Sequence, residues 1–246
     1  MHTPLEHLYR KLGTQLGKAC KQYGLLNEGD KILIGLSGGK DSYALLELLA
    51  RRRRIFAPRF ELYATHVVMR NIPYLTDLNY IRELCHTLDV PLSVVETEFD
   101  PTTDHRKSPC FLCSWNRRKA LFEEAKRLGC NKLGLGHHQD DILQTLLMNL
   151  TFQGAFGTMP PRLEMDKFDM TLVRPMCLIK ESQLIELAKL RNYPTQIKSC
   201  PYETDSNRSN IKAVFEQLET LSPHLRSHLW NAMHNIQPQY LPQQTD

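Results

Sequence analysis

The fold is decided by the stretch KILIGLSGGKDS, residues 31–42. Its first six residues are a short apolar run, typical of a strand buried on both faces of a sheet. Ser37-Gly38-Gly39 ends the run, and a helical pattern follows from Asp41 to Arg51. In such a turn the glycines let the backbone approach phosphate closely, and the helix N-terminus offers free N–H groups. The stretch predicts a phosphate-binding loop, although a plain capped turn would explain Ser-Gly-Gly alone.

Strands and helices alternate along most of the chain. Further strands are predicted at 60–68, 91–97 and 131–136, with helices at 4–23, 75–88 and 139–151 and a basic helix that follows Cys113 and runs to Leu128. This alternation indicates an α/β fold with a parallel sheet covered on both faces. The carboxyl ends of its strands share one edge, where ligands bind in such folds.

The pattern changes beyond residue 152. A loop and short hairpin come first, and helices are predicted near 181–191, 209–220 and 222–234. We therefore expect three parts: an N-terminal helix (1–24), an α/β domain that carries the phosphate-binding loop (25–152) and a mostly helical C-terminal appendage (153–246).

Composition is that of an ordinary globular protein. Of the 246 residues, 41% are hydrophobic and 24% are charged, which excludes a disordered or collagen-like chain. The formal net charge of +4 permits a nucleic-acid partner without implying one. No apolar run is long enough to span a bilayer and no signal peptide is recognised, so we expect a cytoplasmic protein without a membrane partner. Its seven cysteines are then thiols or metal ligands.

A second glycine turn, GHHQDD, occupies residues 136–141 after the fourth predicted strand. Adjacent histidines do not face the same way on a helix, which disfavours a metal pair at His137 and His138. Asp140 and Asp141 either cap the following helix or take part in chemistry at the same sheet edge as the first turn.

Two cysteines in the stretch CFLC, Cys110 and Cys113, lie where a loop meets a helix. A redox dithiol, half a zinc site and half an iron–sulfur site are all compatible with this spacing. Cys200 is the only other cysteine in a predicted loop, and three thiolates would leave one iron of a cubane cluster open. The other four cysteines lie in or beside apolar elements and are expected to be buried. Basic residues after Cys113 suit a polyanionic substrate, although part of them is ordinary solvated surface.

The string SGGKDS resembles the PP-loop of the ATP pyrophosphatase superfamily. Together with CFLC, GHHQDDILQTLLMN and the late Cys200, in this order, it resembles the tRNA 2-thiocytidine synthetase family. Unlike some members, this chain has no second CxxC around its late cysteine. The resemblance implies a three-layer PP-loop domain of the adenine nucleotide alpha hydrolase-like (HUP) class. It also implies an enzyme that adenylates C2 of a cytidine in the tRNA anticodon loop and replaces the oxygen with sulfur.

The resemblance also implies the roles of individual residues. ATP would lie on the loop and its surroundings: Leu36, Ser37, Gly38, Gly39, Lys40, Asp41, Ser42, His66, Gly136 and His137. Mg²⁺ would be held at Asp41, and Asp140 or Asp141 would lie near the reacting centre. Cys110, Cys113 and Cys200 would hold a 4Fe–4S cluster, with Cys110 and Cys200 counted among the catalytic residues. The expected partners are tRNA, a sulfur donor such as a cysteine desulfurase, and a second copy in a homodimer.

Three other functions stay open from the sequence. The same apparatus could transfer sulfur to another base or to a small molecule. A lysidine synthetase-like ligase would join an amine to an adenylated base, a chemistry that needs no cysteines. A non-catalytic nucleotide-binding module could carry structural zinc at the cysteines.

Overall fold

The computed structural model describes residues 3–55, 57–72, 74–100, 102, 108–166, 168–198 and 207–242. The chain forms two compact units that are discontinuous in sequence. The first unit comprises residues 1–139 and 160–204, and the second comprises 140–159 and 205–246. The division expected from the sequence, 1–24, 25–152 and 153–246, stays a prediction about domains. Cys200 is outside the described residues.

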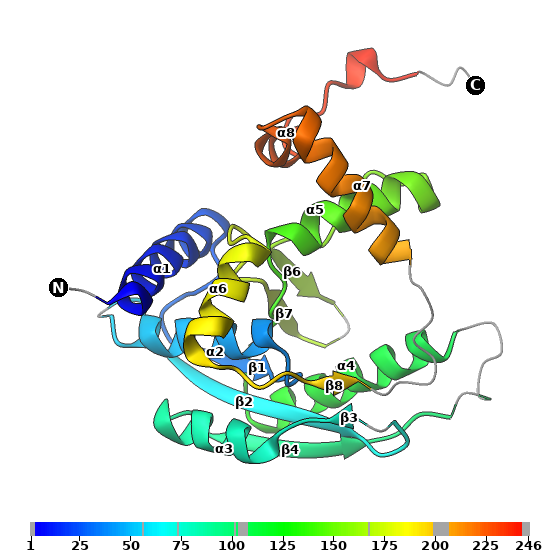
Figure 1. The fold of residues 1–246 in the computed structure, drawn as a ribbon. Coiled ribbons are helices and arrows are strands. Elements are labelled where there is room, and N and C mark those ends of the chain that lie inside the picture. Colours follow the sequence, from blue (N-terminus) through cyan, green and yellow to red (C-terminus); the bar gives the residue numbers. More distant parts are fainter. Residues whose placement is uncertain are drawn as a thin grey trace. The chain divides into compact units, whose positions relative to one another are not determined.

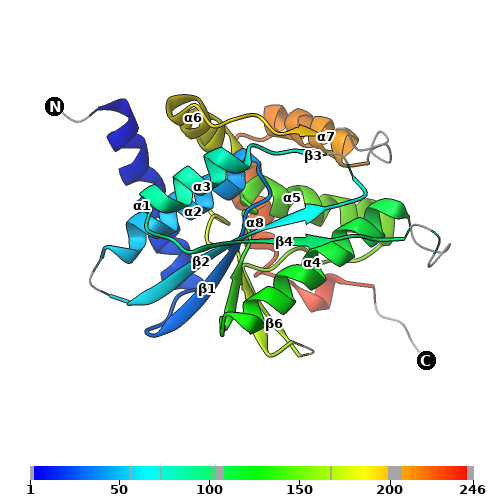
Figure 2. The same cartoon turned by 90° about the horizontal axis from the view of Figure 1, so that it is seen from below.

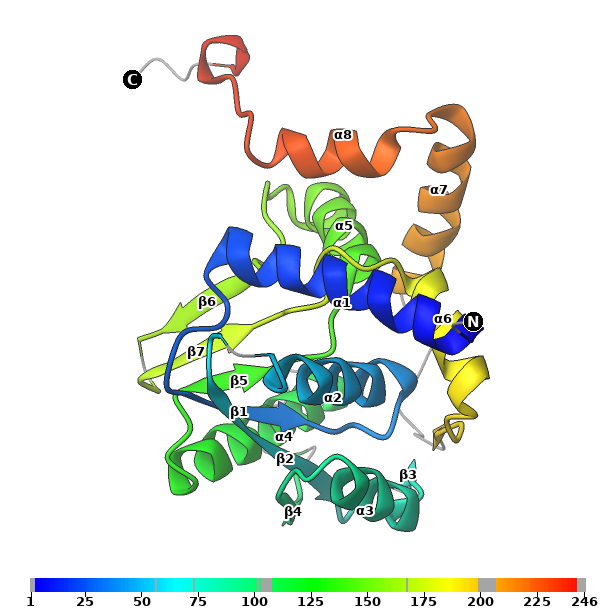
Figure 3. The same cartoon turned by 90° about the vertical axis from the view of Figure 1, so that its left-hand side faces the viewer.

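The first unit is built on a six-stranded sheet (Figure 1). Its strands are β1 (Asp30–Gly35), β2 (Phe60–Met69), β4 (Leu92–Thr97), β5 (Lys132–Gly134), β6 (Arg162–Met165) and β7 (Met170–Val173). Their order in space is β4-β2-β1-β5-β7-β6, which can be followed in Figure 3. All neighbours are parallel except β6 and β7, which form an antiparallel hairpin. The predicted parallel α/β sheet is confirmed, and the hairpin extends it.

Helices cover both faces of this sheet. They are α1 (Pro4–Tyr23), α2 (Lys40–Arg53), α3 (Leu78–Thr87), α4 (Pro109–Arg127) and α6 (Glu181–Arg191). Helix α2 packs on β1 and β2 and is itself covered by α1 and α6, whereas α4 packs along β1, β2, β4 and β5 (Figure 2). A separate short pair joins β3 (Tyr74–Leu75) to β8 (Ile197–Lys198), which the sequence did not indicate.

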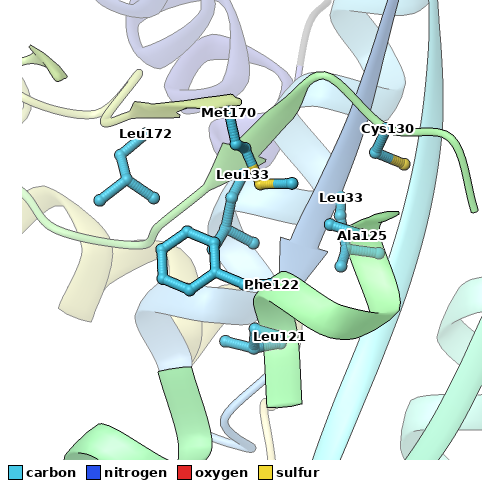
Figure 4. Close-up of a cluster of buried hydrophobic side chains, with 8 residues drawn as sticks. All are labelled: Leu33, Leu121, Phe122, Ala125, Cys130, Leu133, Met170 and Leu172. Atoms are coloured by element: carbon cyan, nitrogen blue, oxygen red, sulfur yellow. The ribbon is translucent and has the colours of Figure 1, made fainter. Parts of the chain in front are cut away.

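One part of the apolar core lies between α4 and the sheet. Successive strand side chains point to opposite faces. Leu33 packs in a cluster with Leu121, Phe122 and Ala125 of α4 and with Leu133 of β5 (Figure 4). Met170 and Leu172 of β7 complete it, so the hairpin contributes to the same core as the central strands.

Two buried carboxylates, Asp30 and Glu47, connect elements of the first unit. Lys132 at the start of β5 lies 2.6 Å from Asp30 at the start of β1, and both side chains are buried. On α2 the buried Glu47 accepts hydrogen bonds from the guanidinium of Arg191 in α6 and from the hydroxyl of Tyr9 in α1. These pairs hold α1, α2 and α6 in a fixed relation.

The second unit is helical. Its elements are α5 (Gln139–Met148), which begins one residue inside the first unit, a π-turn (Asn149–Gln153), α7 (Asn207–Leu221), α8 (Leu225–Ala232) and a short 3-10 turn (Pro238–Tyr240). Helices α7 and α8 contact each other, and Arg226 of α8 lies over the ring of Phe215 in α7. Within the described ranges, no helix combines the length and apolar character needed to cross a membrane.

Candidate functional site

The predicted phosphate loop joins β1 to α2. Gly39 precedes the first turn of α2 in an extended conformation, and its N–H donates to the Ser37 hydroxyl at 3.3 Å. The Ser42 hydroxyl donates to the carbonyl of Gly39 at 2.8 Å. Both serines are therefore held around the turn, close to the N-terminus of α2, where the helix dipole favours an anion.

Gly38 is required by its surroundings as well as by its backbone. Its φ of +89° is unfavourable for other residues, and a Cβ there would lie 2.6 Å from Cγ2 of Thr76. The amide of Gln196 donates to the carbonyl of Ser37 at 2.7 Å and to the hydroxyl of Thr76 at 3.0 Å. Residues next to β3 and β8 thus hold the loop from outside the βαβ unit.

Charged side chains gather at the start of α2. The ammonium group of Lys40 lies 3.1 Å from the Asp41 carboxylate and 3.2 Å from that of Glu181. Burial alone would lower the pKa of Lys40, but its ion pairs with Asp41 and Glu181 outweigh burial and raise it. Lys40 therefore stays positively charged beside the loop. When phosphate binds, the ammonium group of Lys40 can keep its ion pairs with Asp41 and Glu181 or exchange them for contacts with the phosphate.

The second glycine turn meets the first. A Cβ on Gly136 would lie 3.1 Å from the backbone carbonyl of Asp41 and 3.2 Å from the backbone nitrogen of Ser42. Strands β1 and β5 are neighbours, but the chain runs from β1 to β2 and β4 before it returns to β5. The crevice between β1 and β5 is therefore the switch point of the sheet, where ligands bind in open α/β folds.

Arg174, the residue that follows β7, orients the ring of His137 in the second glycine turn. Nε of Arg174 donates to Nδ1 of His137 at 3.2 Å, and Nη1 donates to the Pro160 carbonyl at 2.6 Å. Arg174 is 5% exposed. A cation from the hairpin thus reaches the sheet edge that carries both glycine turns.

His66 lines a cavity of about 90 Å³ next to the loop. Ser37, Thr76, Arg117 and Gln196 line the same cavity. The Nδ1 atom of His66 lies 2.7 Å from the Leu36 carbonyl, so it carries the proton and donates. Burial lowers the pKa of His66, and Arg117 lowers it further. His66 is thus a neutral side chain that connects the end of β1 to this cavity.

The predicted cluster ligands lie at the start of α4. Ser108 caps the helix by accepting from the N–H of Phe111, and Cys110 is exposed whereas Cys113 is buried. Cys113 packs with Met69, the last residue of β2, and with Phe99, which lies just after β4. The other described cysteines are buried as predicted: burial raises the pKa of Cys20 and Cys177 to about 12 and of Cys85 and Cys130 to about 11.

No group of three metal-binding side chains occurs among the residues that the structure describes. The third expected ligand, Cys200, lies outside them. The described chain therefore supplies two of the three predicted thiols.

Asp140 and Asp141 belong to the second unit, and arginines pair with both. The Asp140 carboxylate, nearly buried, lies 2.7 Å from the Arg226 guanidinium, which also pairs with Glu219 at 2.6 Å. The Asp141 carboxylate pairs with Arg208, whose side chain is 50% exposed. Asp140 thus has a partner that is 17% exposed, whereas the partner of Asp141 is half-exposed to solvent.

Sequence reasoning missed several residues around the loop. They are Thr76, Arg174, Glu181 and Gln196, whereas Arg117 belongs to the basic residues that the sequence pointed to after Cys113. Arg174 carried a usable signal, because it directly follows the apolar run Met170–Val173 and so ends a strand. Gln196 and Glu181 had none, since their positions depend on how distant segments fold back on the loop.

Comparison with known proteins gives three findings. A model of the PP-loop domain family matches residues 7–217. The tRNA-cytidine(32) 2-sulfurtransferases of Syntrophotalea carbinolica and Geobacter sulfurreducens are 38% and 34% identical; the alignments cover 96% and 95% of this chain and 93% and 92% of the relatives. The solved structure of the U34-tRNA thiolase NcsA from Methanococcus maripaludis with its 4Fe–4S cluster is similar with a TM-score of 0.74 at 25% identity, over 95% of this chain and 81% of that one.

Proposed function

We propose the function from the premise that this chain belongs to the PP-loop family and, within it, to the tRNA-cytidine(32) 2-sulfurtransferases. The resemblance drawn from the sequence, and the PP-loop fold it implied, are confirmed. The chain is an ATP-dependent tRNA sulfurtransferase. The observation that carries this function is the meeting of the two glycine turns, Gly136 against Asp41, at the switch point of the sheet.

The loop binds and orients the phosphates of ATP. Backbone N–H groups at the start of α2 and the hydroxyls of Ser37 and Ser42 face the same turn, and they would hold the departing pyrophosphate. Lys40 supplies a positive charge beside them, and Asp41 would hold Mg²⁺. Gly136 and His137 border the nucleotide from the β5 side, where Arg174 fixes the ring of His137.

The reaction has two steps on the base, for which we take C2 of a cytidine in the anticodon loop. The base oxygen attacks the α-phosphorus of ATP, and pyrophosphate leaves. A sulfur nucleophile then forms a bond to C2, and AMP leaves with the former base oxygen. The enzyme contributes mainly positioning and charge stabilisation at the phosphorus and at C2.

The residues present fit an iron–sulfur cluster on Cys110, Cys113 and Cys200. Residues three apart on a helix share a face, so the side chains of Cys110 and Cys113 can contact one cluster. Gln196 lines the same cavity as Arg117 of α4, and the four residues from Gln196 to Cys200 can span at most about 14 Å. When bound, the cluster would offer an iron without a protein ligand as the holder of the transferred sulfur. Cys113 would be the ligand shielded from solvent.

Further parts of the proposal concern partners and acid–base chemistry. Asp141 is the better candidate for proton transfer, because the nearly buried Asp140 pairs with Arg226, which is itself mostly shielded from solvent. A cysteine desulfurase or free sulfide would supply sulfur, and two chains would form a homodimer. The ranges 1–24, 25–152 and 153–246 remain our proposed domain division.

The test is anaerobic purification with iron, sulfide and zinc counted per chain, followed by incubation with ATP, Mg²⁺, sulfide and unmodified tRNA. We expect about four irons and four sulfides per chain, AMP release and 2-thiocytidine in the digested tRNA. Cys110→Ala, Cys113→Ala and Cys200→Ala should each lose iron, whereas the buried Cys130→Ser should keep it. Asp41→Asn should abolish AMP release without changing the absorption spectrum.

Each rival function predicts a different result. Zinc without sulfide after attempted reconstitution, and no AMP release, would favour the nucleotide-binding module. AMP release that depends on an added amine would favour the ligase. Thiolation of another base or of a small molecule, with tRNA cytidines unchanged, would keep the chemistry and replace the substrate.

A further inference from the structure

One face of α4 is exposed over its first three turns. Its residues recur at helical spacing and are Cys110, Phe111, Ser114, Trp115, Arg118 and Lys119, all exposed. We call this set the α4 strip. Farther along α4 the same face is buried against the sheet through Leu121, Phe122 and Ala125, so the exposed part is confined to the first three turns. The α4 strip is therefore a surface of the first unit that begins at a proposed cluster ligand.

The composition of the strip is unusual for a solvent-facing helix. Trp115 is 49% exposed and Phe111 is 43% exposed, and they lie one turn apart. The ammonium group of Lys119 lies 5.7 Å from the centre of the Trp115 ring. The strip has no acidic residue, and the nearest one along the helix is Glu123, which pairs with Lys119 at 3.8 Å. Two large aromatic rings and two cations on one helix face match a ligand with flat apolar surfaces and negative charges.

We propose that the α4 strip binds unpaired nucleotides of the RNA substrate, with Trp115 stacking on a base and Arg118 and Lys119 contacting phosphates. Single-stranded RNA is recognised by bases stacked on aromatic side chains and by cations along the backbone. The strip is about 14 Å long at 1.5 Å per helical residue, which matches about four stacked nucleotides. This inference rests on the proposed function for the identity of the RNA.

The position of the strip suits a loop that must present one base for reaction. It starts at Cys110, and its neighbour Arg117 lines the cavity that Ser37 of the phosphate loop also lines. A nucleotide stacked on Trp115 therefore lies within a few helical turns of both the proposed cluster and the nucleotide site. Stacking of flanking bases would hold the loop open while the target cytidine is adenylated.

Trp115 also provides the probe for the test. The chain has two tryptophans, and Trp230 in α8 is 9% exposed. In a Trp230→Phe background the emission reports on Trp115 alone. We expect a stem–loop RNA of anticodon-arm sequence to quench this emission, and a blunt duplex of equal length and charge to leave it unchanged. Equal quenching by both would overturn stacking and indicate binding by charge alone.

Binding measurements in the wild-type background keep the test independent of that variant. Trp115→Leu should weaken binding of the stem–loop by roughly 5- to 100-fold, and Trp115→Phe should recover most of it. Arg118→Gln with Lys119→Gln should reduce the slope of log affinity against log salt by about one per lost phosphate contact. The matched control is Lys11→Gln with Lys18→Gln on the exposed face of α1, which should change neither quantity.

The outcomes separate this proposal from the proposed function. Unchanged stem–loop affinity in Trp115→Leu, together with normal thiolation, would overturn the strip and leave the enzyme assignment intact. Loss of affinity in Trp115→Leu with no thiolation by the wild type would support the strip and reject the enzyme assignment. A self-association constant weakened by Trp115→Leu, with RNA binding unchanged, would show that the strip contacts a second copy instead. Iron content must be unchanged in each variant.

Discussion

A Cβ placed on Gly136 would lie 3.1 Å from the backbone carbon and oxygen of Asp41. The two residues are 95 positions apart in the chain, yet they form the floor of the crevice between β1 and β5. Because the contact is with backbone atoms of α2's first turn, no side chain can move aside to make room. The glycine therefore sets how closely the second turn approaches the phosphate loop.

Gly136→Ala should consequently impair catalysis more than folding. The added methyl group must push the first turn of α2 by a few tenths of an ångström, and small misplacements of this kind reduce rates by about 10- to 100-fold. The measurement is ATP-dependent AMP release with tRNA and sulfide present. Gly13→Ala is the control, because a Cβ there meets nothing within 4 Å and should leave the rate unchanged. A normal rate in Gly136→Ala would contradict this role for the crevice.

The arginine partners of Asp140 and Asp141 should contribute differently to the free energy of unfolding. Arg226 is 17% exposed and pairs with the nearly buried Asp140, so Arg226→Met leaves a buried carboxylate without its cation. We expect a loss of about 2–4 kcal/mol in the free energy of unfolding, measured by urea denaturation. Arg208→Met removes a half-exposed partner of Asp141 and should cost less than about 1 kcal/mol. Equal losses in the two variants would refute the distinction.

His66 should make stability fall as the pH falls below neutrality. Burial lowers its folded-state pKa from the ordinary 6.5, so between the two values the unfolded chain binds more protons at this position than the folded chain. Stability is thus fully present above pH 6.5 and decreases below it, by at most about 1.4 kcal/mol per pH unit. His66→Asn keeps a donor toward the Leu36 carbonyl and cannot titrate. Its unfolding free energy should depend less on pH between 6.5 and 5 than that of the wild type.

The fold was predictable from local pattern because the central strands are predominantly apolar runs. KILIGL is largely buried, as is the run 60–68 apart from the exposed Glu61, and that burial is what the sequence pattern records. The position of the hairpin was not predictable in this way. Its second strand, Met170–Val173, is as apolar as the others, but it lies beyond a proline-rich loop, and parallel pairing with β5 is a non-local choice.

Those parts of the site that depend on backbone conformation were predictable from the sequence. Gly38 and Gly136 have constraints that only glycine meets, so they are visible in a single sequence. Glu181 and Gln196 are not, because an exposed-looking polar residue gains its role only when α6 and the segment before β8 return to the loop. The order of residues therefore identifies the chemistry of the loop, while tertiary packing decides which side chains surround it.

The last prediction compares the alkylation rate of the proposed cluster ligand Cys110 with the rates of the buried cysteines. At pH 8, thiols whose pKa is about 11 or 12 are ionised in roughly one molecule in a thousand or fewer, and Cys20, Cys85, Cys130 and Cys177 are also buried. In cluster-free protein, iodoacetamide should therefore modify the exposed Cys110 at least about 100-fold faster than these four, as followed by mass spectrometry of peptides.

Loading with iron and sulfide should then protect Cys110 without changing the four buried residues, because a thiolate bound to iron is not available for alkylation. Urea provides the control, since all seven cysteines should react in the unfolded chain. Modification of Cys110 at the same rate with and without iron would remove it from the ligand set. Rapid modification of Cys130 would instead show that the core between α4 and β5 opens under native conditions.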